Sequence, residues 1–93
     1  MNVYPREVED LLALHPAVAD VVVFGAPDEE YGEQVRAVVE PLGEPAPGLA
    51  EQLVAHCRER LAHYKCPRRI DLVDRVPRSD AGKILLDRVR GAV

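Results

Sequence analysis

The sequence predicts a small α/β (α+β) domain, in which helices pack on a mixed three-stranded sheet in the element order α-β-β-α-β-α. Two stretches repeat their apolar residues with helical spacing, and three others show the β-branched or alternating patterns of strands. The helical stretches are residues 5–15 and 49–64, and the strand-like ones are residues 18–25, 34–41 and 69–77. With 93 residues, 47% of them apolar and 30% charged, residues 1–93 are expected to form one globular domain.

The first helix is expected to begin at Pro5, because the first helical position needs no backbone N–H and proline already has a helical φ. Pro16 ends it. Its apolar face is formed by residues at positions i, i+3, i+4 and i+7, namely Val8, Leu11, Leu12 and His15. A histidine that closes an apolar stripe before a proline is usually structural. His15 is therefore interpreted as structural rather than as a base or a metal ligand.

The first two strands are predicted at Val18–Gly25 and Gln34–Pro41. The second alternates apolar and polar residues, which is typical of a half-buried strand antiparallel to the first. Between them, residues 26–32 are expected to form a loop with three consecutive carboxylates, Asp28, Glu29 and Glu30. Adjacent side chains diverge, whereas a hard cation needs converging ligands. A solvated acidic loop is therefore favoured over a metal site.

Two prolines and two glycines predict a surface connection at residues 42–48, which leads into a helix at Leu49–Tyr64. The apolar stripe of this helix is Leu49, Leu53, Cys57, Leu61 and Tyr64. The third strand is predicted at Arg69–Pro77, with Ile70, Leu72 and Val76 facing inward. If it runs parallel to the second strand, the connection through the helix is expected to be right-handed.

One group of side chains has the chemistry of a zinc site: His56, Cys57, His63 and Cys66. However, Cys57 lies about 100° round the helix from His56, and the sequence has no Cys-x-x-Cys or His-x3-His pair. We therefore predict no metal site and interpret Cys57 as a core residue. Two cysteines do not make a disulfide framework, so a reducing, cytoplasmic setting is expected.

The net charge is −4, but it is unevenly distributed. Residues 1–57 carry 2 of the 12 Lys and Arg residues and 11 of the 16 Asp and Glu residues, which leaves residues 58–93 basic. The basic part suits an anionic ligand or an acidic partner, and a segregated solvated surface explains it equally well. Overall acidity, 4% aromatics and the lack of a binding motif argue against a nucleic-acid partner. No apolar run is long enough to span a membrane.

The most distinctive stretch is residues 77–85, Pro-Arg-Ser-Asp-Ala-Gly-Lys-Ile-Leu, between the last strand and a terminal helical turn. Gly82 gives the backbone freedom directly before Lys83. An ammonium is thereby held on a loop from which it can reach a phosphate or a developing negative charge. The stretch is not a Walker A loop, because Pro77 and Ile84 stand where that loop needs glycine and Ser or Thr.

This stretch resembles the last core motif of the adenylate-forming enzymes, which are the acyl-CoA synthetases, the luciferases and the adenylation domains of peptide synthetases. Their C-terminal domain carries Pro-Arg-Thr/Ser-x-x-Gly-Lys-Ile/Val, and residues 77–84 match it, with Ser79 as the usual variant. Four further landmarks match in order: Asn2-Val3-Tyr4-Pro5-x-Glu7-Val8-Glu9, His15-Pro16-x-Val18, Gly25-x-Pro27-Asp28 with Gly32-Glu33, and Tyr64-Lys65-x-Pro67. The resemblance covers almost the whole chain and is greatest to an acyl-CoA synthetase. It fails at Leu85-Leu86-Asp87, where basic residues are usual, and this weakens the case for a phosphate contact there.

The resemblance implies the C-terminal domain of an ATP-dependent carboxylate ligase, which converts an acid, ATP and CoA into acyl-CoA, AMP and pyrophosphate. Lys83 matches the catalytic lysine that bridges the acyl carboxylate and the α-phosphate end of the nucleotide during adenylation. ATP, with magnesium, and CoA are then co-substrates of the full enzyme, and neither is bound tightly by this domain alone. Gly82, beside that lysine, is grouped with the residues that bind these co-substrates.

For the thiol half-reaction the resemblance implies a second set of residues. Asn2, Val3 and Tyr4 match the loop that lines the pantetheine tunnel. Arg58, 25 residues before Lys83, matches a basic position that contacts a CoA phosphate in some acyl-CoA synthetases. The implied partners are an N-terminal adenylation domain in the same protein, the acyl-adenylate, and CoA or the pantetheine of a carrier protein.

The nucleotide-binding loop and the acyl pocket belong to that N-terminal domain of the family, which is absent from this chain. This domain is therefore expected to be inactive alone. The alternative is a free-standing, non-catalytic binding module of the same fold, which docks a carrier protein or another acidic partner through its basic part and does not need Lys83.

Overall fold

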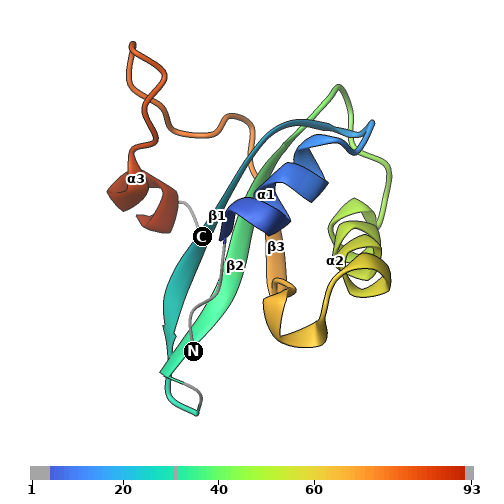
Figure 1. Cartoon of the computed structure of the whole chain (residues 1–93). Helices are drawn as coiled ribbons and strands as arrows, with labels where there is room; N and C mark the ends of the chain where they lie inside the picture. The colour runs from blue at the N-terminus through green and yellow to red at the C-terminus, as the bar shows by residue number, and fades with distance from the viewer. Residues whose placement is uncertain (1–4, 31, 92–93) are drawn as a thin grey trace.

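The computed structural model describes residues 5–30 and 32–91 and confirms the predicted order of helices and strands (Figure 1). In chain order the elements are α1 (Pro5–Ala13), β1 (Val18–Asp28), β2 (Gly32–Pro41), α2 (Leu49–Arg60), the 3-10 turn η1 (His63–Lys65), β3 (Arg69–Leu72) and α3 (Leu86–Gly91). In the sheet order β1-β2-β3, β2 is antiparallel to β1 and parallel to β3. The sheet is therefore mixed and three-stranded, as the sequence predicted. In the described part of the chain, no helix is long and apolar enough to cross a membrane.

The hairpin of β1 and β2 is longer than predicted, because most of the expected acidic loop is strand. Asp28 pairs with Gly32, so the turn is confined between these two residues. Gly25 does not end β1: an added Cβ there would lie 2.6 Å from Cδ of Glu33, so glycine leaves the space that this side chain occupies. Pro27 is tolerated because β1 is an edge strand, where a missing N–H need not cost a hydrogen bond of the ladder.

Carboxylates cover part of the outer edge of β1. Oε2 of Glu9, on α1, accepts a hydrogen bond from the N–H of Val23 at 3.2 Å. Oδ1 of Asp20 accepts one from the N–H of Val21 at 2.8 Å. An exposed strand edge with free amides is a template for pairing with another chain. Because these two amides are occupied, the edge is less available for such pairing.

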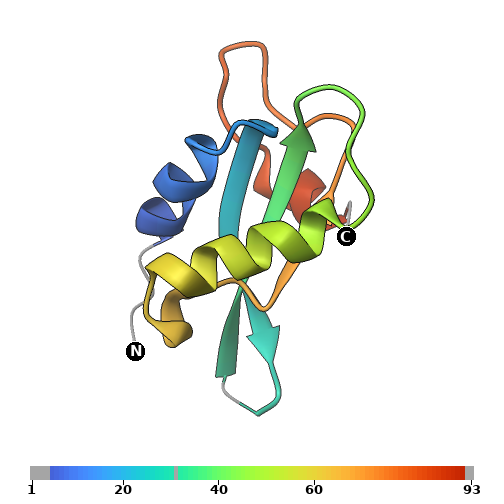
Figure 2. The same cartoon turned by 90° about the vertical axis from the view of Figure 1, so that its right-hand side faces the viewer.

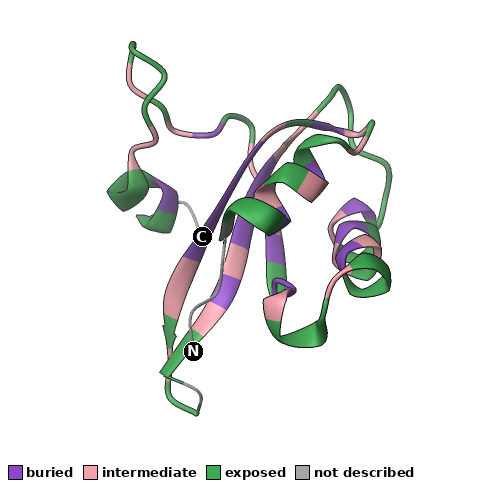
Figure 3. Ribbon diagram, in the orientation of Figure 1, coloured by how far each residue is buried: buried purple, intermediate pink, exposed green. Residues whose placement is uncertain are grey.

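Both faces of the sheet are covered, whereas the alternation in β2 predicted burial of one face only. Helices α1 and α2 cover the first face, and α3 lies behind the strands when α2 is in front (Figure 2). Buried residues are therefore consecutive in the middle of both strands, at residues 21–24 of β1 and 37–39 of β2 (Figure 3). The difference arises because the chain after β3 crosses to the second face and covers Val38 there. The second core consists of Val22, Phe24, Val38, Val76 and Val89.

The predicted ends of α2 and β3 are wrong by several residues. Helix α2 ends at Arg60 rather than Tyr64, and Tyr64 is 53% exposed rather than part of the buried stripe. Leu61 is already extended, because the chain must turn through η1 to bring β3 alongside β2 in the parallel direction. Strand β3 ends at Leu72, because the following residues leave for the second face. Val76 is buried as predicted, but in the second core.

Candidate functional site

Residues 77–85 form a tight hairpin, here called the Lys83 hairpin, which extends from the sheet as a narrow loop (Figure 1). The N–H of Ser79 donates to the carbonyl oxygen of Lys83 at 2.8 Å, and the N–H of Gly82 donates to the carbonyl oxygen of Ser79 at 2.8 Å. A three-residue hairpin loop of this kind needs a left-handed residue at its last position, and Gly82 has φ of +84°. The sequence Asp-Ala-Gly therefore makes the turn directly before Lys83.

Lys83 begins the returning arm of this hairpin. Its N–H donates to Oγ of Ser79 at 3.2 Å, and the next residue, Ile84, packs against the second core. Its side chain is exposed, and within residues 5–30 and 32–91 its ammonium forms no ion pair. The backbone of Lys83 is thus fixed by hydrogen bonds, while its charge remains available to a ligand.

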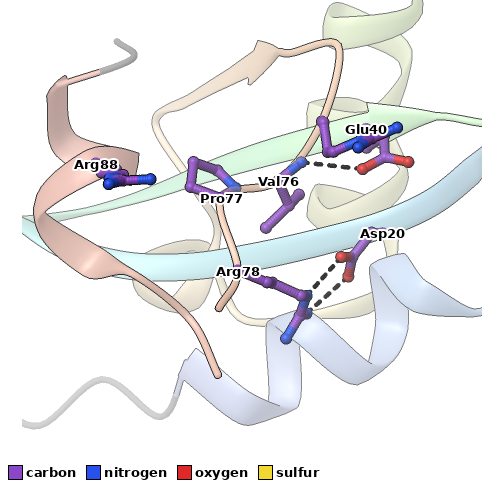
Figure 4. A pocket seen from close by; sticks show the side chains of 7 residues that line it. Asp20, Glu40, Val76, Pro77, Arg78 and Arg88 are labelled. Atoms are coloured by element: carbon purple, nitrogen blue, oxygen red, sulfur yellow. Dashed lines mark hydrogen bonds and ion pairs between the residues drawn. The ribbon is translucent and has the colours of Figure 1, made fainter. Parts of the chain in front are cut away.

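Arg78 joins the Lys83 hairpin to β1 (Figure 4). Its Nε and Nη2 donate to Oδ2 and Oδ1 of Asp20 at 2.7 and 2.8 Å, and its Nη1 donates to the carbonyl oxygen of Gly82 at 2.9 Å. A bidentate arginine–carboxylate pair fixes orientation as well as distance. This pair was not predicted, because its members lie 58 positions apart in the sequence and no periodicity links them. The only signal was the position of Arg78 within the Gly-Lys motif.

The pair between Arg78 and Asp20 also makes the stability of the domain depend on pH. The hydrogen bond from Arg78 lowers the pKa of Asp20 below its ordinary value of 3.8, against the opposing effect of burial. A group whose pKa is lower in the folded state stabilises the fold fully above its unfolded-state pKa. That contribution is lost as the pH falls through the folded-state pKa.

Replacing Asp20 by asparagine is expected to lower the free energy of unfolding by about 0.5 kcal/mol at neutral pH, a small effect because both side chains are about one-third exposed. The difference between wild type and Asp20→Asn should shrink as the pH falls from about 5 toward about 2, since the wild-type carboxylate becomes protonated. Urea denaturation at a series of pH values measures it. A difference that stays constant over this range would contradict the assignment.

An open pocket of about 450 Å³ lies at the base of the hairpin (Figure 4). Its lining consists of Asp20, Glu40, Arg75, Val76, Pro77, Arg78 and Arg88. Both carboxylates already have partners within the domain, since Oε1 of Glu40 accepts the N–H of Val76 at 2.9 Å and Asp20 binds Arg78. Lys83 does not line this pocket. The pocket has charges of both signs and is distinct from the surface that the lysine offers.

Arg58 and Lys83 are not brought together. Arg58 is exposed on α2, which covers the first face of the sheet, whereas the Lys83 hairpin packs on the second (Figure 2). Arg58 borders an open groove of about 490 Å³, lined by Glu51, Val54, Ala55, Arg58, Glu59 and Arg68. The remaining predicted site residues, Asn2, Val3 and Tyr4, lie outside the described residues.

Two of the residues considered for zinc, Cys57 and His56, make contacts within the fold. Among the described residues, no three His, Cys, Asp or Glu side chains come together in a way that could hold a metal ion. Cys57 is fully buried, and burial raises the pKa of its thiol to about 11, which makes the thiol unreactive. Nδ1 of His15 accepts the N–H of Ala17 at 3.0 Å, and its ring lies edge-on to that of His56, with 5.0 Å between centroids.

Part of the charge asymmetry is used inside the fold. Among residues 5–30 and 32–91, several ion pairs join a basic residue of the C-terminal part to an acidic residue of the N-terminal part. These are Lys65 with Glu7 at 3.0 Å, Arg68 with Asp28 at 2.9 Å and Arg78 with Asp20 at 2.7 Å. The excess of basic residues in 58–93 is therefore not by itself evidence of a surface that binds an anionic ligand.

Comparison with known proteins places this geometry in a family. The model of the AMP-binding enzyme C-terminal domain matches residues 7–83. The medium/long-chain-fatty-acid–CoA/3-oxocholest-4-en-26-oate–CoA ligase of Mycolicibacterium smegmatis is 51% identical over 82 residues, which are 88% of this chain and 15% of that protein. The 3-oxocholest-4-en-26-oate–CoA ligase of Rhodococcus rhodochrous is 47% identical over 82 residues, again 88% of this chain and 15% of that protein.

Among solved structures, the fatty acyl CoA synthetase of Mycobacterium tuberculosis is similar to this chain with a TM-score of 0.84 and 38% sequence identity. The match covers 99% of this chain and 18% of that one. The chain thus spans less than a fifth of the length of the curated relatives and of the solved structure that it matches. Because the family model covers most of the chain, up to and including Lys83, the chain belongs to the AMP-binding enzyme C-terminal domain family.

Proposed function

We propose that residues 1–93 are the C-terminal domain of an ATP-dependent acyl-CoA ligase, in which Lys83 serves the adenylation half-reaction. The observation that carries the proposal is the Lys83 hairpin, which fixes the backbone of the lysine and leaves its ammonium exposed. The similar proteins named above are CoA ligases and a fatty acyl CoA synthetase, which supports the same reaction class. An N-terminal adenylation domain of the same protein would supply the nucleotide loop and the acyl pocket.

In the first half-reaction, a carboxylate oxygen of the acid attacks the α-phosphorus of ATP. The new P–O bond gives the acyl-adenylate, and the bond from the α-phosphorus to the bridging oxygen breaks and releases pyrophosphate. Both reacting groups are negatively charged, so they repel each other as they approach. An ammonium between them stabilises both charges and fixes their geometry, which is the role proposed for Lys83.

In the second half-reaction, the sulfur of CoA attacks the acyl carbon and AMP leaves. Arg58 lies on the helix that covers the first face, and the base of the Lys83 hairpin packs on the second, which supports a division of labour between two surfaces of the domain, one for each half-reaction. The exposed guanidinium of Arg58 suits a phosphate of CoA. Asn2, Val3 and Tyr4 are proposed for the pantetheine tunnel.

Magnesium is proposed to enter with ATP as part of the co-substrate of the full-length protein. We further expect the parent protein to work in the cytoplasm. Cys57 and Cys66 are both free thiols, which suits a reducing compartment.

The proposal is tested with the full-length protein that contains this chain. It is incubated with ATP and a panel of carboxylic acids that includes medium- and long-chain fatty acids. Pyrophosphate release is expected with at least one acid, and acyl-CoA is expected when CoA is added. Deleting residues 1–93 should abolish acyl-CoA formation. A folded full-length protein that releases no pyrophosphate with any acid would contradict the proposal and favour the non-catalytic binding module.

Replacing Arg58 by alanine is expected to raise the KM for CoA about tenfold, the loss expected when one charge-assisted hydrogen bond to a phosphate is removed. Pyrophosphate release in the absence of CoA should stay unchanged, because that half-reaction does not involve α2. The matched control is Arg60→Ala, which changes an exposed arginine on the same helix that contacts its neighbour Glu59 and the carbonyl oxygen of His56. Equal effects of the two variants on the KM for CoA would reject a specific contact by Arg58.

A further inference from the structure

The Lys83 hairpin has few polar connections to the rest of the domain. In the part of the chain that the structure describes, the pair between Arg78 and Asp20 is the only hydrogen bond or ion pair that joins residues 78–83 to residues outside the hairpin. All other hydrogen bonds of residues 78–83 lie within the hairpin. Val76 and Ile84 anchor its base in the second core, but Lys83 and the turn before it are exposed.

The guanidinium of Arg78 also contacts the peptide group that precedes Lys83. Its Nη1 donates to the carbonyl oxygen of Gly82, which belongs to the peptide bond between Gly82 and Lys83. Asp20 is itself fixed on β1, because its Oδ1 accepts the N–H of Val21 at 2.8 Å. A continuous series of hydrogen bonds therefore runs from β1 through Asp20 and Arg78 to the backbone of Lys83.

We infer that Arg78 and Asp20 form a positioning clamp, which sets where the Lys83 ammonium stands in the adenylation site without contacting the substrate. This inference rests on the function proposed for Lys83. Three of the five N–H donors of Arg78 are engaged within the domain, which fixes the guanidinium between β1 and the hairpin. Misplacing a reacting group by about 1 Å can slow a reaction about 100-fold. An ion pair this exposed contributes little to folding.

The test uses Arg78→Ala and Asp20→Ala in the full-length protein. Each variant is expected to lower kcat for pyrophosphate release about tenfold while the KM for ATP stays within about twofold, because the lysine is misplaced but no ligand contact is lost. Thioester formation from a synthetic acyl-adenylate should stay at the wild-type rate. The melting temperature should fall by less than about 3 °C. The double variant should be no slower than Arg78→Ala alone, since both substitutions remove the same clamp.

A second readout is independent of activity. Amide hydrogen exchange within residues 78–85 is expected to become faster in Arg78→Ala, because the hairpin loses its polar tether to β1. The matched control is Arg75→Ala. Arg75 lines the same pocket, and its guanidinium forms no hydrogen bond or ion pair with any described residue. This control should change neither the exchange rates of the hairpin nor kcat. Arg78→Lys keeps the charge without the bidentate geometry and should recover only part of the rate.

Some results would overturn the clamp. If Arg78→Ala raised the KM for ATP and left kcat unchanged, Arg78 would be a ligand contact. If Asp20→Ala left kcat unchanged, the pair would have no positioning role. Wild type and Lys83→Ala are measured alongside to separate the two proposals. A slow Lys83→Ala beside a normal Arg78→Ala rejects the clamp alone, whereas an inactive wild type or a normal Lys83→Ala rejects the proposed function.

Discussion

Replacing Lys83 by alanine in the full-length protein is expected to slow pyrophosphate release by about 100- to 1,000-fold, the range seen when one preorganised donor is removed from a reacting oxyanion. The loss is large because the carboxylate and the α-phosphate would approach each other without a compensating charge. Acyl-CoA formation from a preformed acyl-adenylate should stay within about twofold of wild type, since the charge conflict is confined to the first half-reaction. Both rates are measured by following pyrophosphate and acyl-CoA in separate assays.

Two variants control for charge and for folding. Lys65→Ala removes the other lysine of the chain, which lies in η1 and pairs with Glu7 at the far end of the sheet from the Lys83 hairpin (Figure 1). It is expected to leave pyrophosphate release unchanged. Lys83→Arg keeps the charge but changes its shape and reach, so it should recover only part of the activity. If Lys83→Ala slowed both half-reactions equally, a specific role in adenylation would be rejected, and an unchanged rate would favour the binding module.

The sequence was sufficient to predict the turn that presents Lys83, because that turn depends on local chemistry. Gly82 before Lys83 identified a position with unusual backbone freedom, and the structure gives it a left-handed φ of +84°. The order of the helices and strands could also be predicted from the sequence. Pro5, Pro16 and the apolar spacing of the two longer helices carry that information over short distances along the chain.

The features that the sequence did not reveal depend on contacts between distant segments. The strand pattern in β2 indicated one buried face, and only the return of residues 73–89 to the sheet buries Val38 on the other. Likewise, the apolar stripe continues to Tyr64, but α2 ends at Arg60 because the chain must reverse to place β3 beside β2. The pair between Arg78 and Asp20 belongs to the same class of contact. The spacing of apolar residues indicates the type of one helix or strand and which of its faces is buried. It does not indicate which charged side chains from distant segments form pairs in the folded domain.

Replacing Leu53 by alanine is expected to lower the free energy of unfolding by about 3 kcal/mol, the largest effect on stability that we expect of the substitutions considered. Leu53 is fully buried on α2, in the first core, a cluster that also includes residues of α1 and all three strands. Its truncation removes apolar contacts and leaves a cavity that the surrounding helices and sheet close only in part. A domain of this size has a total stability of about 5–10 kcal/mol, so the loss is a large fraction of it.

The measurement is urea denaturation of the 93-residue chain, in which the midpoint should fall by about 2 M with an unchanged slope. Leu14→Ala is a matched control, because it makes the same chemical change at a side chain that is 84% exposed, and it should shift the free energy of unfolding by less than about 0.5 kcal/mol. Similar losses for the two variants would show that α2 is not packed on the sheet as described. A wild-type chain without a cooperative transition would reject residues 1–93 as an independent domain. If both expectations hold, residues 1–93 fold as one cooperative domain in which α2, the helix that carries Arg58, is packed on the sheet.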